Sequence, residues 1–455
     1  MDKFDLEIKR IVEFYNSSLS LSEQKSELEI DCIIKRIKND YELEKYDFAN
    51  FKTLNLKQNG KTRIAKQYEA WSTELFLCIY LKRCIDRLFK VKYPNRNNDM
   101  KLMFSTISSI QNMKDFVIVR FDFEDFFNSI SSEYVYNKCI LSSSLGRVHK
   151  DLLKKFTSSC PYCYAGINTS NVLAEILSSE FDNLVYNIFA TNGLIFYKRY
   201  VDDGVLIFNR YISKDECVEM LNTAIDKIFY NKFVNTLHKC HTKLNMQEGK
   251  FSYVSKRILD LNPNSVYKIH FLGYQFSLRK SDKRIDVIYG LTNSKIEKYT
   301  KKINKIIDDY AQNADIELLR HRLKAFTCRT VYRRKHYNTR IWIVKGFISN
   351  YNELRYHIDK IDAETQMFLQ KGVLLSFENR GIQIPYFLID DSERSPYSLY
   401  YNLKRNRSLL FEENERIGIN KNTLKDMCRK VGISVNEKSY NYLLREYLIK
   451  IKVGH

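Results

Sequence analysis

Three carboxylates in this sequence stand where apolar segments end. Asp122 follows the apolar run 116–121, and Asp202 and Asp203 lie between two further apolar runs. Clustered carboxylates repel one another unless a cation neutralises them. Oxygen-only ligands suit Mg²⁺ or Mn²⁺, and two such ions about 4 Å apart activate a hydroxyl and stabilise a leaving pyrophosphate. We therefore expect these three side chains to hold two Mg²⁺ ions, or Mn²⁺, although an Asp-Asp pair is also ordinary turn chemistry.

The segments around these carboxylates alternate between strand and helix patterns. Residues 116–121 predict a buried strand, and 194–200 and 205–208 predict two strands joined at the Asp-Asp turn. Helices are expected over 170–188 and 213–229. This order favours an α+β fold in which an antiparallel sheet is backed by helices.

The flanking segments differ in character. Residues 1–48 are expected to form an N-terminal helical extension, and the alternation around Asn59-Gly60 predicts a β-hairpin. From about residue 291 the sequence is basic and favours helices, so 291–380 is expected to be a basic helical domain. A Pro-containing stretch then opens a C-terminal helical extension, 381–455.

The charge balance points to a polyanionic partner. The 455 residues carry 74 Lys and Arg against 54 Asp and Glu, a formal charge of +20. Nucleic acid is the leading candidate for such a partner. No apolar run reaches the roughly 18 residues of a bilayer span, and the start MDKFDLEIKR lacks the apolar core of a signal peptide. We expect a cytoplasmic protein with no membrane partner.

Four blocks occur in a fixed order between residues 57 and 280. Asp-Phe-Glu-Asp-Phe-Phe begins at Asp122, Tyr-Val-Asp-Asp spans 200–203, a lysine-bearing block spans 244–250, and Phe-Leu-Gly-Tyr spans 271–274. In type and order they resemble the catalytic and primer-grip blocks of reverse transcriptases, in particular the bacterial retron-like and phage-defence (abortive-infection type) groups. The resemblance implies a right-hand polymerase, with fingers and palm in 49–290 and the thumb in 291–380.

The resemblance also assigns roles at the reaction centre. It implies that the Phe123 carbonyl is a further metal ligand and that Lys250 protonates the leaving pyrophosphate. Phe127 matches the position of a steric gate, whose ring disfavours a ribose hydroxyl and so selects deoxynucleotides. The alternatives are a core position for Phe127 and a solvated surface charge for Lys250.

Further residues would contact the substrate. Lys61 and Arg63 flank the predicted hairpin turn and could reach the triphosphate, although hairpin cations are by default solvated charges. Gly166 opens a block that resembles the family segment lining the template and the nascent base pair. This block departs from the family pattern, because Ala165 replaces Gln or Thr and Asn168 and Asn171 replace prolines. Template handling is therefore where this chain would differ.

Nucleic-acid contacts are expected from two other regions. Tyr200 and the primer-grip residues Gly273 and Tyr274 would contact the strand being extended. In the basic region, arginines interleave with aromatic residues, which suits phosphate contacts together with stacking on unpaired bases. The arginines expected to bind are Arg322, Arg329, Arg333, Arg334 and Arg340.

The sequence thus predicts an RNA-directed DNA polymerase that adds dNTPs to a primer 3′-hydroxyl. The resemblance implies a structured noncoding RNA template, a DNA product, and assembly into an oligomer or with a second protein in a bacterial anti-phage or retron-like system. Two alternatives stay open. One is a template-independent or protein-primed DNA polymerase on the same fold, and the other is a catalytically silent RNA-binding scaffold.

Overall fold

The chain folds into two compact units. The computed structural model describes residues 3–19, 23–58, 61–281, 284–336, 339–389, 395–413 and 417–452. The first unit comprises Met1–Ser17, Lys25–Ser265 and Lys280–Ile285, and the second comprises Ser18–Gln24, Val266–Arg279 and Asp286–His455. The units divide the chain near residue 265, whereas the sequence suggested divisions after 48, 290 and 380.

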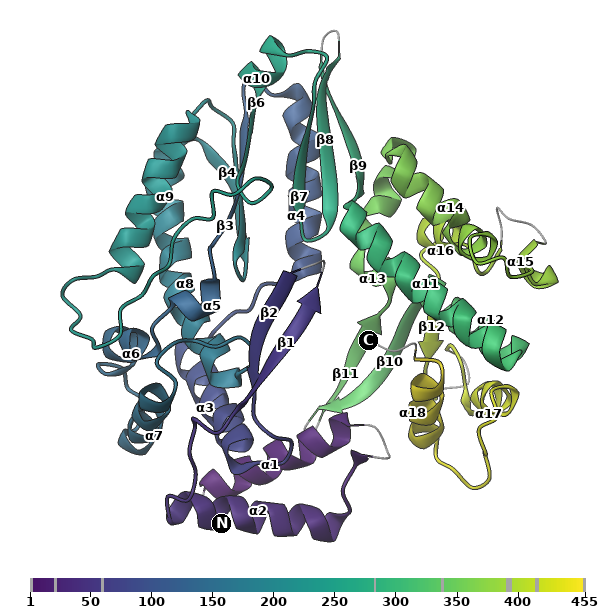
Figure 1. The fold of residues 1–455 in the computed structure, drawn as a ribbon, viewed down its shortest axis with the longest axis horizontal. Coiled ribbons are helices and arrows are strands. Elements are labelled where there is room, and N and C mark those ends of the chain that lie inside the picture. The colour runs from purple at the N-terminus through teal and green to yellow at the C-terminus, as the bar shows by residue number, and fades with distance from the viewer. Residues whose placement is uncertain are drawn as a thin grey trace. The chain divides into compact units, whose positions relative to one another are not determined.

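A four-stranded sheet forms the centre of the first unit. Its order is β4-β5-β3-β6, and each pair of neighbours is antiparallel (Figure 1). The strands are β3 (Val117–Asp122), β4 (Leu194–Tyr200), β5 (Asp203–Phe208) and β6 (Ser252–Ser255). The α+β class expected from the sequence is confirmed at this level, while the division into fingers, palm and thumb stays a prediction.

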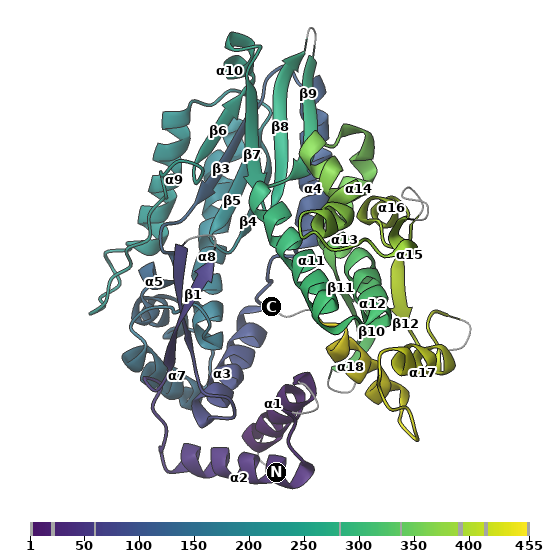
Figure 2. The same ribbon diagram turned by 45° about the vertical axis from the view of Figure 1, so that its right-hand side comes forward.

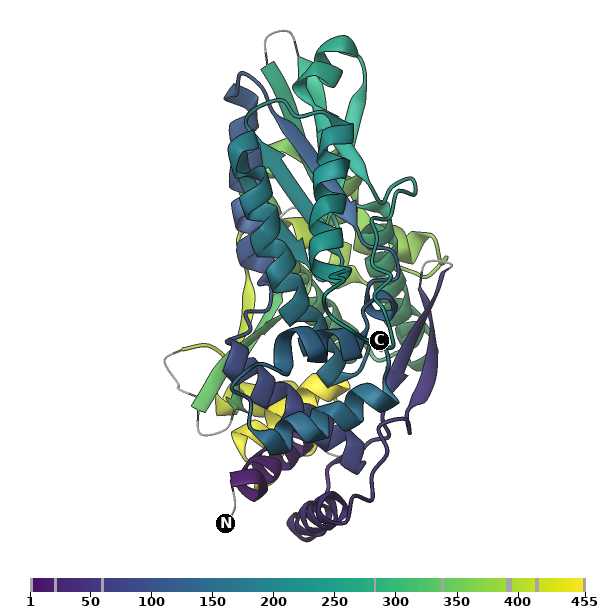
Figure 3. The ribbon, with the colours of Figure 1, turned by 90° about the vertical axis from the view of Figure 1, so that its left-hand side faces the viewer.

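Helices α8 (Asn168–Phe189) and α9 (Lys214–Phe229) run along one face of this sheet (Figure 3). Alternate residues of β3, namely Val117, Val119 and Phe121, join the same buried cluster as Phe181 of α8. Because successive side chains of a strand point to opposite faces, Ile118, Arg120 and Asp122 lie on the other face. The helices thus cover one face of the sheet, and Asp122 lies on the other face.

The remaining elements of the first unit surround this core. The N-terminal helices α1 (Lys3–Ser18) and α2 (Glu27–Glu42) contribute Ile8 and Ile37 to the same cluster, so they are part of this unit's core. The predicted hairpin is present as β1 (Lys52–Gln58) and β2 (Lys61–Gln67), and its turn, Asn59-Gly60, lies outside the described residues. The other elements are α3 (Thr73–Phe89), α4 (Arg96–Ser109), α5 (Phe126–Ser129), α6 (Ser132–Val135), η3 (Tyr136–Ile140), α7 (Arg147–Ser159) and α10 (Lys256–Leu261).

The second unit starts with a three-stranded sheet of order β7-β8-β9. Strands β7 (Val266–Phe271) and β8 (Tyr274–Ser281) are joined by Leu272 and Gly273, which both have positive φ, as a type I′ hairpin turn requires. β9 (Arg284–Leu291) follows. The helices after it are α11 (Asn293–Asn313), α12 (Ile316–Thr327), α13 (Phe347–Asn350), η5 (Asn352–Lys360), α14 (Ala363–Glu378), α15 (Tyr386–Ile389) and α16 (Leu399–Lys404).

The basic region is expected to be mostly helical, and residues 329–336 and 339–345 depart from that pattern. These residues form a β-hairpin of β10 (Arg329–His336) and β11 (Thr339–Lys345), and β12 (Ser408–Phe411) pairs with β10 in parallel (Figure 2). Runs such as Thr-Val-Tyr and Ile-Trp-Ile-Val are rich in β-branched and aromatic residues, which favour strands. Helices α17 (Lys421–Lys430) and α18 (Tyr440–Lys450) complete the unit.

None of the described helices combines sufficient length with sufficient apolarity to cross a bilayer.

Candidate active site

Asp122 and Asp203 are direct cross-strand partners. Asp122 is the last residue of β3 and Asp203 is the first of β5, and the antiparallel register places them opposite each other. Directly opposed residues of an antiparallel pair have side chains on the same face. Two carboxylates more than 80 residues apart in sequence therefore meet at one end of the sheet.

Asp202 lies in the turn that leads into β5. Its carbonyl oxygen accepts a hydrogen bond of 3.2 Å from the backbone N–H of Phe123, the residue after Asp122. Phe123 also forms a β-bridge with Leu244, so its backbone is held from both sides. All three predicted carboxylate residues and Phe123 are thus brought into one region of the first unit.

Two cations hold the opposed carboxylates. Lys250 Nζ forms an ion pair with Asp122 Oδ2. Arg120 Nη2 contacts Asp203 Oδ1 and lies 3.7 Å from Asp122 Oδ2. Arg120 Nη1 donates to the carbonyl oxygens of Gly249 and, over 3.0 Å, of Lys250. One buried guanidinium therefore connects both carboxylates with the loop that carries Lys250.

The burial of Asp122 shapes its electrostatics. The residue is 2% exposed, and this burial raises the pKa of its carboxyl group, an effect that the hydrogen bond from Lys250 opposes. Its second oxygen, Oδ1, is buried without a hydrogen-bond partner. An unsatisfied buried carboxylate oxygen is costly and suits a further cationic ligand.

Two of the residues expected to form a two-metal site, Asp122 and Asp203, are paired with cations in this structure. Across the part of the chain that the structure describes, no three His, Cys, Asp or Glu side chains are grouped closely enough to hold a metal ion. Lys250 and Arg120 neutralise the carboxylates in this geometry. Metal binding by Asp122, Phe123, Asp202 and Asp203 therefore stays a prediction. The buried oxygen Asp122 Oδ1, which has no hydrogen-bond partner, is consistent with that prediction.

Gly204 makes room beneath the carboxylate pair. It is the cross-strand partner of Phe121, and a Cβ atom built on it would lie 2.2 Å from the Phe121 ring. Such a contact is far inside van der Waals distance. Only glycine at this position lets the ring of Phe121 pack under β5.

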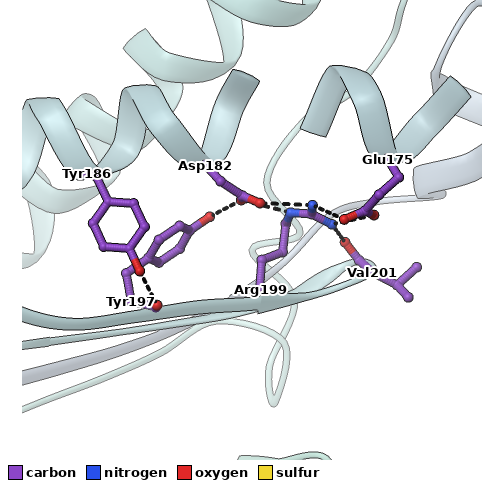
Figure 4. Close-up of polar contacts among 6 residues, drawn as sticks. All are labelled: Glu175, Asp182, Tyr186, Tyr197, Arg199 and Val201. Carbon is purple, nitrogen blue, oxygen red and sulfur yellow. Dashed lines mark hydrogen bonds and ion pairs between the residues drawn. The ribbon is translucent and has the colours of Figure 1, made fainter. Parts of the chain in front are cut away.

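The turn that carries Asp202 is supported by a buried polar network (Figure 4). The Arg199 guanidinium donates to Asp182 Oδ1 and Oδ2 over 2.9 and 3.0 Å and to Glu175 Oε1 over 3.1 Å. It also donates to the Val201 carbonyl oxygen over 2.7 Å. Burial opposes the charge of Arg199, but Asp182 and Glu175 outweigh it and raise the pKa of the guanidinium.

The same network extends along β4 (Figure 4). The hydroxyl of Tyr197 donates to Asp182 Oδ1 over 2.6 Å, and that of Tyr186 donates to the Tyr197 carbonyl oxygen over 2.8 Å. Helix α8 thus holds β4 through its side chains up to the turn. Tyr200, the last residue of β4, is half-buried and pairs in register with Asp203.

The predicted substrate-binding residues lie in the same unit. Phe126 is 5% exposed and stacks on Phe123, whereas Phe127 is half-buried against the edge of the core. Gly166 has a φ of +100°, and a Cβ atom there would lie 2.4 Å from the Lys66 carbonyl oxygen. Lys66 N–H also donates to Ala165 over 2.8 Å, so the 165–166 block packs against β2.

Two predicted triphosphate contacts are on that strand. Lys61 and Arg63 are residues of β2 and pair with Gln58 and Leu56 of β1. Their side chains lie outside what the structure describes, so their contact with a triphosphate stays a prediction.

The primer-grip residues belong to the second unit. Gly273 has a φ of +85°, and a Cβ atom there would meet Lys295 and Tyr351 at 2.7 and 2.8 Å. Tyr274 is 1% exposed, and its hydroxyl donates to the Asn350 carbonyl oxygen over 3.1 Å. The ring of Tyr274 therefore packs inside this unit, and contact with a primer through these residues stays a prediction.

The predicted arginines of the basic region are in different environments. Arg322 pairs with Asp309, and Arg329 donates to Ser408 over 3.2 Å, so both connect elements of the second unit. Arg333 and Arg340 are exposed on the β10–β11 hairpin. Arg334 is in β10, and its side chain lies outside the described residues.

The sequence interpretation missed three contributors to this site: Arg120, Gly204 and Arg199. For Arg120 a signal was present, because a lone charge two residues before Asp122 in an apolar strand must share its face. The roles of Gly204 and Arg199 depend on contacts with Phe121 and α8, which the sequence does not reveal.

Comparisons with known proteins gave only distant likenesses. No family model and no curated protein matches the sequence. Among solved structures, telomerase of Candida tropicalis in complex with a fragment of telomeric RNA is 11% identical with a TM-score of 0.34, over 92% of this chain and 68% of that one.

Two further telomerase structures are similar to the same degree. The Candida albicans enzyme in complex with an RNA fragment is 10% identical with a TM-score of 0.32, over 87% of this chain and 65% of that one. A truncated apo form of the Candida tropicalis enzyme is 11% identical with a TM-score of 0.30, over 53% of this chain. The chain spans about half of the length of that apo form, 55%.

Proposed function

We propose that the chain is an RNA-directed DNA polymerase that transfers deoxynucleotides onto a primer 3′-hydroxyl. The observation that supports this most is the opposition of Asp122 and Asp203 in register, with Lys250 on the buried carboxylate. Asp122 at the end of β3 and Asp203 at the start of β5 lie beside a cation. Such a site can bind the metal ions and the phosphate groups that take part in nucleotidyl transfer.

The residues take separate roles in this proposal. Asp122, Asp203 and Asp202 would hold two Mg²⁺ ions, or Mn²⁺, together with the Phe123 carbonyl. Those ions, when bound, lower the pKa of the attacking hydroxyl and neutralise the charge that develops on the phosphates. Lys250, which contacts Asp122 in the structure, would donate a proton to the leaving pyrophosphate once the carboxylate is neutralised otherwise.

The substrate residues complete the proposal. Phe127 lies five residues after Asp122, at the edge of the core, and would exclude a ribose hydroxyl. Lys61 and Arg63 on β2 would contact the triphosphate. Gly166, which has no side chain, would let the nascent base pair approach the protein backbone. The template would be a structured noncoding RNA in a bacterial defence or retron-like system, and an oligomer or a second protein would belong to the active assembly.

Primer extension by purified protein tests the catalytic proposal. Replacement of Asp202 and Asp203 by Ala should abolish dNTP incorporation on a primed RNA template with Mg²⁺. Asp226→Asn, at an exposed carboxylate of α9, is the matched control and should retain activity. Circular dichroism would show that each variant folds. Extension by the double variant at the wild-type rate would remove the assignment.

Sequencing of the products separates the two polymerase alternatives. A faithful copy of a defined template supports RNA-directed synthesis. Untemplated sequence, or a product covalently attached to the chain, indicates template-independent or protein-primed synthesis instead. The absence of incorporation with every template, primer and metal would leave the RNA-binding scaffold.

A further inference from the structure

The sheet β11-β10-β12 has one covered face and one open face. On the covered face, Leu409 and Phe411 are 5% and 1% exposed and pack in a cluster with residues of α17 and α18. Tyr332 packs against the same cluster. Since neighbours in a strand alternate between faces, Val331, Arg333 and Leu410 lie on the other side.

A groove of about 240 Å³ is present on that other side. Trp342, the cross-strand partner of Arg333, is 46% exposed in it. Aliphatic side chains from β10, β12 and the segment after β12 form the rest of its apolar wall. The groove is lined by Val331, Arg333, Trp342, Leu410, Glu412 and Ile417.

Arg333 is held beside the indole of Trp342. Its guanidinium carbon lies 4.6 Å from the ring centroid, and its Nε lies 2.9 Å from Glu412 Oε2. The carboxylate thus fixes the guanidinium next to the ring. The guanidinium lies over the indole ring, so the two planar groups form one cation–π pair at the groove.

The hairpin beside this groove is basic, whereas the segment after β12 contains Glu412, Glu413 and Glu415. The hairpin 329–345 contains six Lys and Arg and no Asp or Glu. An apolar groove alone would suit many ligands, but cations concentrated on the same hairpin favour a polyanion. Aromatic and guanidinium faces bind bases whose faces are unstacked, whereas a duplex keeps its base faces covered.

We propose that this groove binds an unpaired base of a single-stranded nucleic acid. The base lies against Trp342 and Arg333, and its phosphates contact the cations of the hairpin. The inference relies on the proposed function only for the choice of nucleic acid as ligand, because Asp122, Asp202 and Asp203 take no part. It adds a binding site for single strands that is built from residues of the second unit.

Tryptophan fluorescence provides a direct test. The chain has two tryptophans, so Trp71→Phe leaves Trp342 as the only reporter. In EDTA and without dNTPs, 12-nucleotide single strands of RNA and of DNA should quench this fluorescence, and a 12-base-pair duplex should not. Trp342→Ala in the otherwise unchanged chain should weaken binding of labelled single strands about 5- to 100-fold, whereas Trp342→Phe should retain most of it.

Ile341→Ala is the matched control. Ile341 precedes Trp342 in β11, is exposed, and lies on the opposite face of the strand. Its replacement should leave single-strand affinity unchanged. Equal losses in Ile341→Ala and Trp342→Ala would overturn the proposal, as would the absence of quenching or equal quenching by duplex. Stronger quenching by polyglutamate than by oligonucleotides would assign the groove to an acidic protein segment and also overturn it.

The same titration separates this inference from the catalytic proposal. It is repeated in the chain with Asp202 and Asp203 replaced by Ala, where quenching should persist. Quenching without primer extension in the wild-type chain would remove the polymerase assignment alone. Normal extension without quenching would remove the groove alone.

Discussion

The guanidinium of Arg199 donates a 2.7 Å hydrogen bond to the carbonyl oxygen of Val201, whose φ is +61°. A β-branched residue in the left-handed region costs about 1–3 kcal/mol and persists only where its surroundings enforce it. The Arg199 side chain is 1% exposed and fixed by Asp182 and Glu175. The strained turn before Asp202 is therefore held by a rigid group anchored on α8.

We expect Arg199→Lys to reduce primer extension at least tenfold while the protein stays folded. Lysine keeps the charge beside Asp182 and Glu175, but it lacks the fork of donors that reaches both α8 and the turn. Arg199 is a positioning residue, so the loss should appear in kcat rather than in the KM for dNTP. Tyr186→Phe removes a hydrogen bond at the far end of the network and should leave both constants near wild type. Equal kcat in the two variants would contradict this role.

Gly204→Ala should destabilise the protein by about 1–3 kcal/mol, because the added methyl group overlaps the Phe121 ring. Urea unfolding followed by circular dichroism measures this change. Phe121→Leu removes the overlapping ring atoms, so the double variant should be more stable than Gly204→Ala alone. If the stability losses of Gly204→Ala and Phe121→Leu instead add in full, overlap between these two residues is not the cause of the destabilisation.

Arg120→Met should make the unfolding temperature depend more strongly on Mg²⁺. Without Arg120, the carboxylates of Asp122 and Asp203 face each other with less compensation, and the variant should unfold at a lower temperature in EDTA. Millimolar Mg²⁺ should restore part of this loss through binding to the folded state. Adding Asp203→Asn removes one carboxylate and should suppress the Mg²⁺ effect. A variant that responds to Mg²⁺ no more than the wild type would speak against a metal at this pair.

Acid should destabilise the second unit through His321. Burial lowers the pKa of this imidazole below its ordinary value of 6.5, and its Nδ1 lies 2.8 Å from the Tyr447 hydroxyl. Below pH 6.5 the unfolded chain therefore binds a proton more readily than the folded chain, and stability falls as pH falls. Thermal unfolding between pH 7.5 and pH 5 should show a smaller decline for His321→Gln. Identical declines would exclude His321 as a contributor.

The sequence by itself determined the strands that carry the carboxylates. The apolar run before Asp122 and the runs on either side of Asp202 and Asp203 are strong local signals, because a buried strand needs apolar side chains on both faces. The helices α8 and α9 follow from the helical periodicity of their apolar residues. The hairpin of β10 and β11 shows the limit, since its β-branched and aromatic residues form strands within a region expected to be mostly helical.

Only the tertiary structure decided which partners these carboxylates meet. The register that opposes Asp122 to Asp203, the reach of Arg120 to Asp203, and the anchoring of Arg199 on α8 each join residues distant in sequence. Such contacts depend on how strands and helices pack, and local patterns carry no information about that packing. The sequence therefore specified the chemical groups, while packing set their distances and charges.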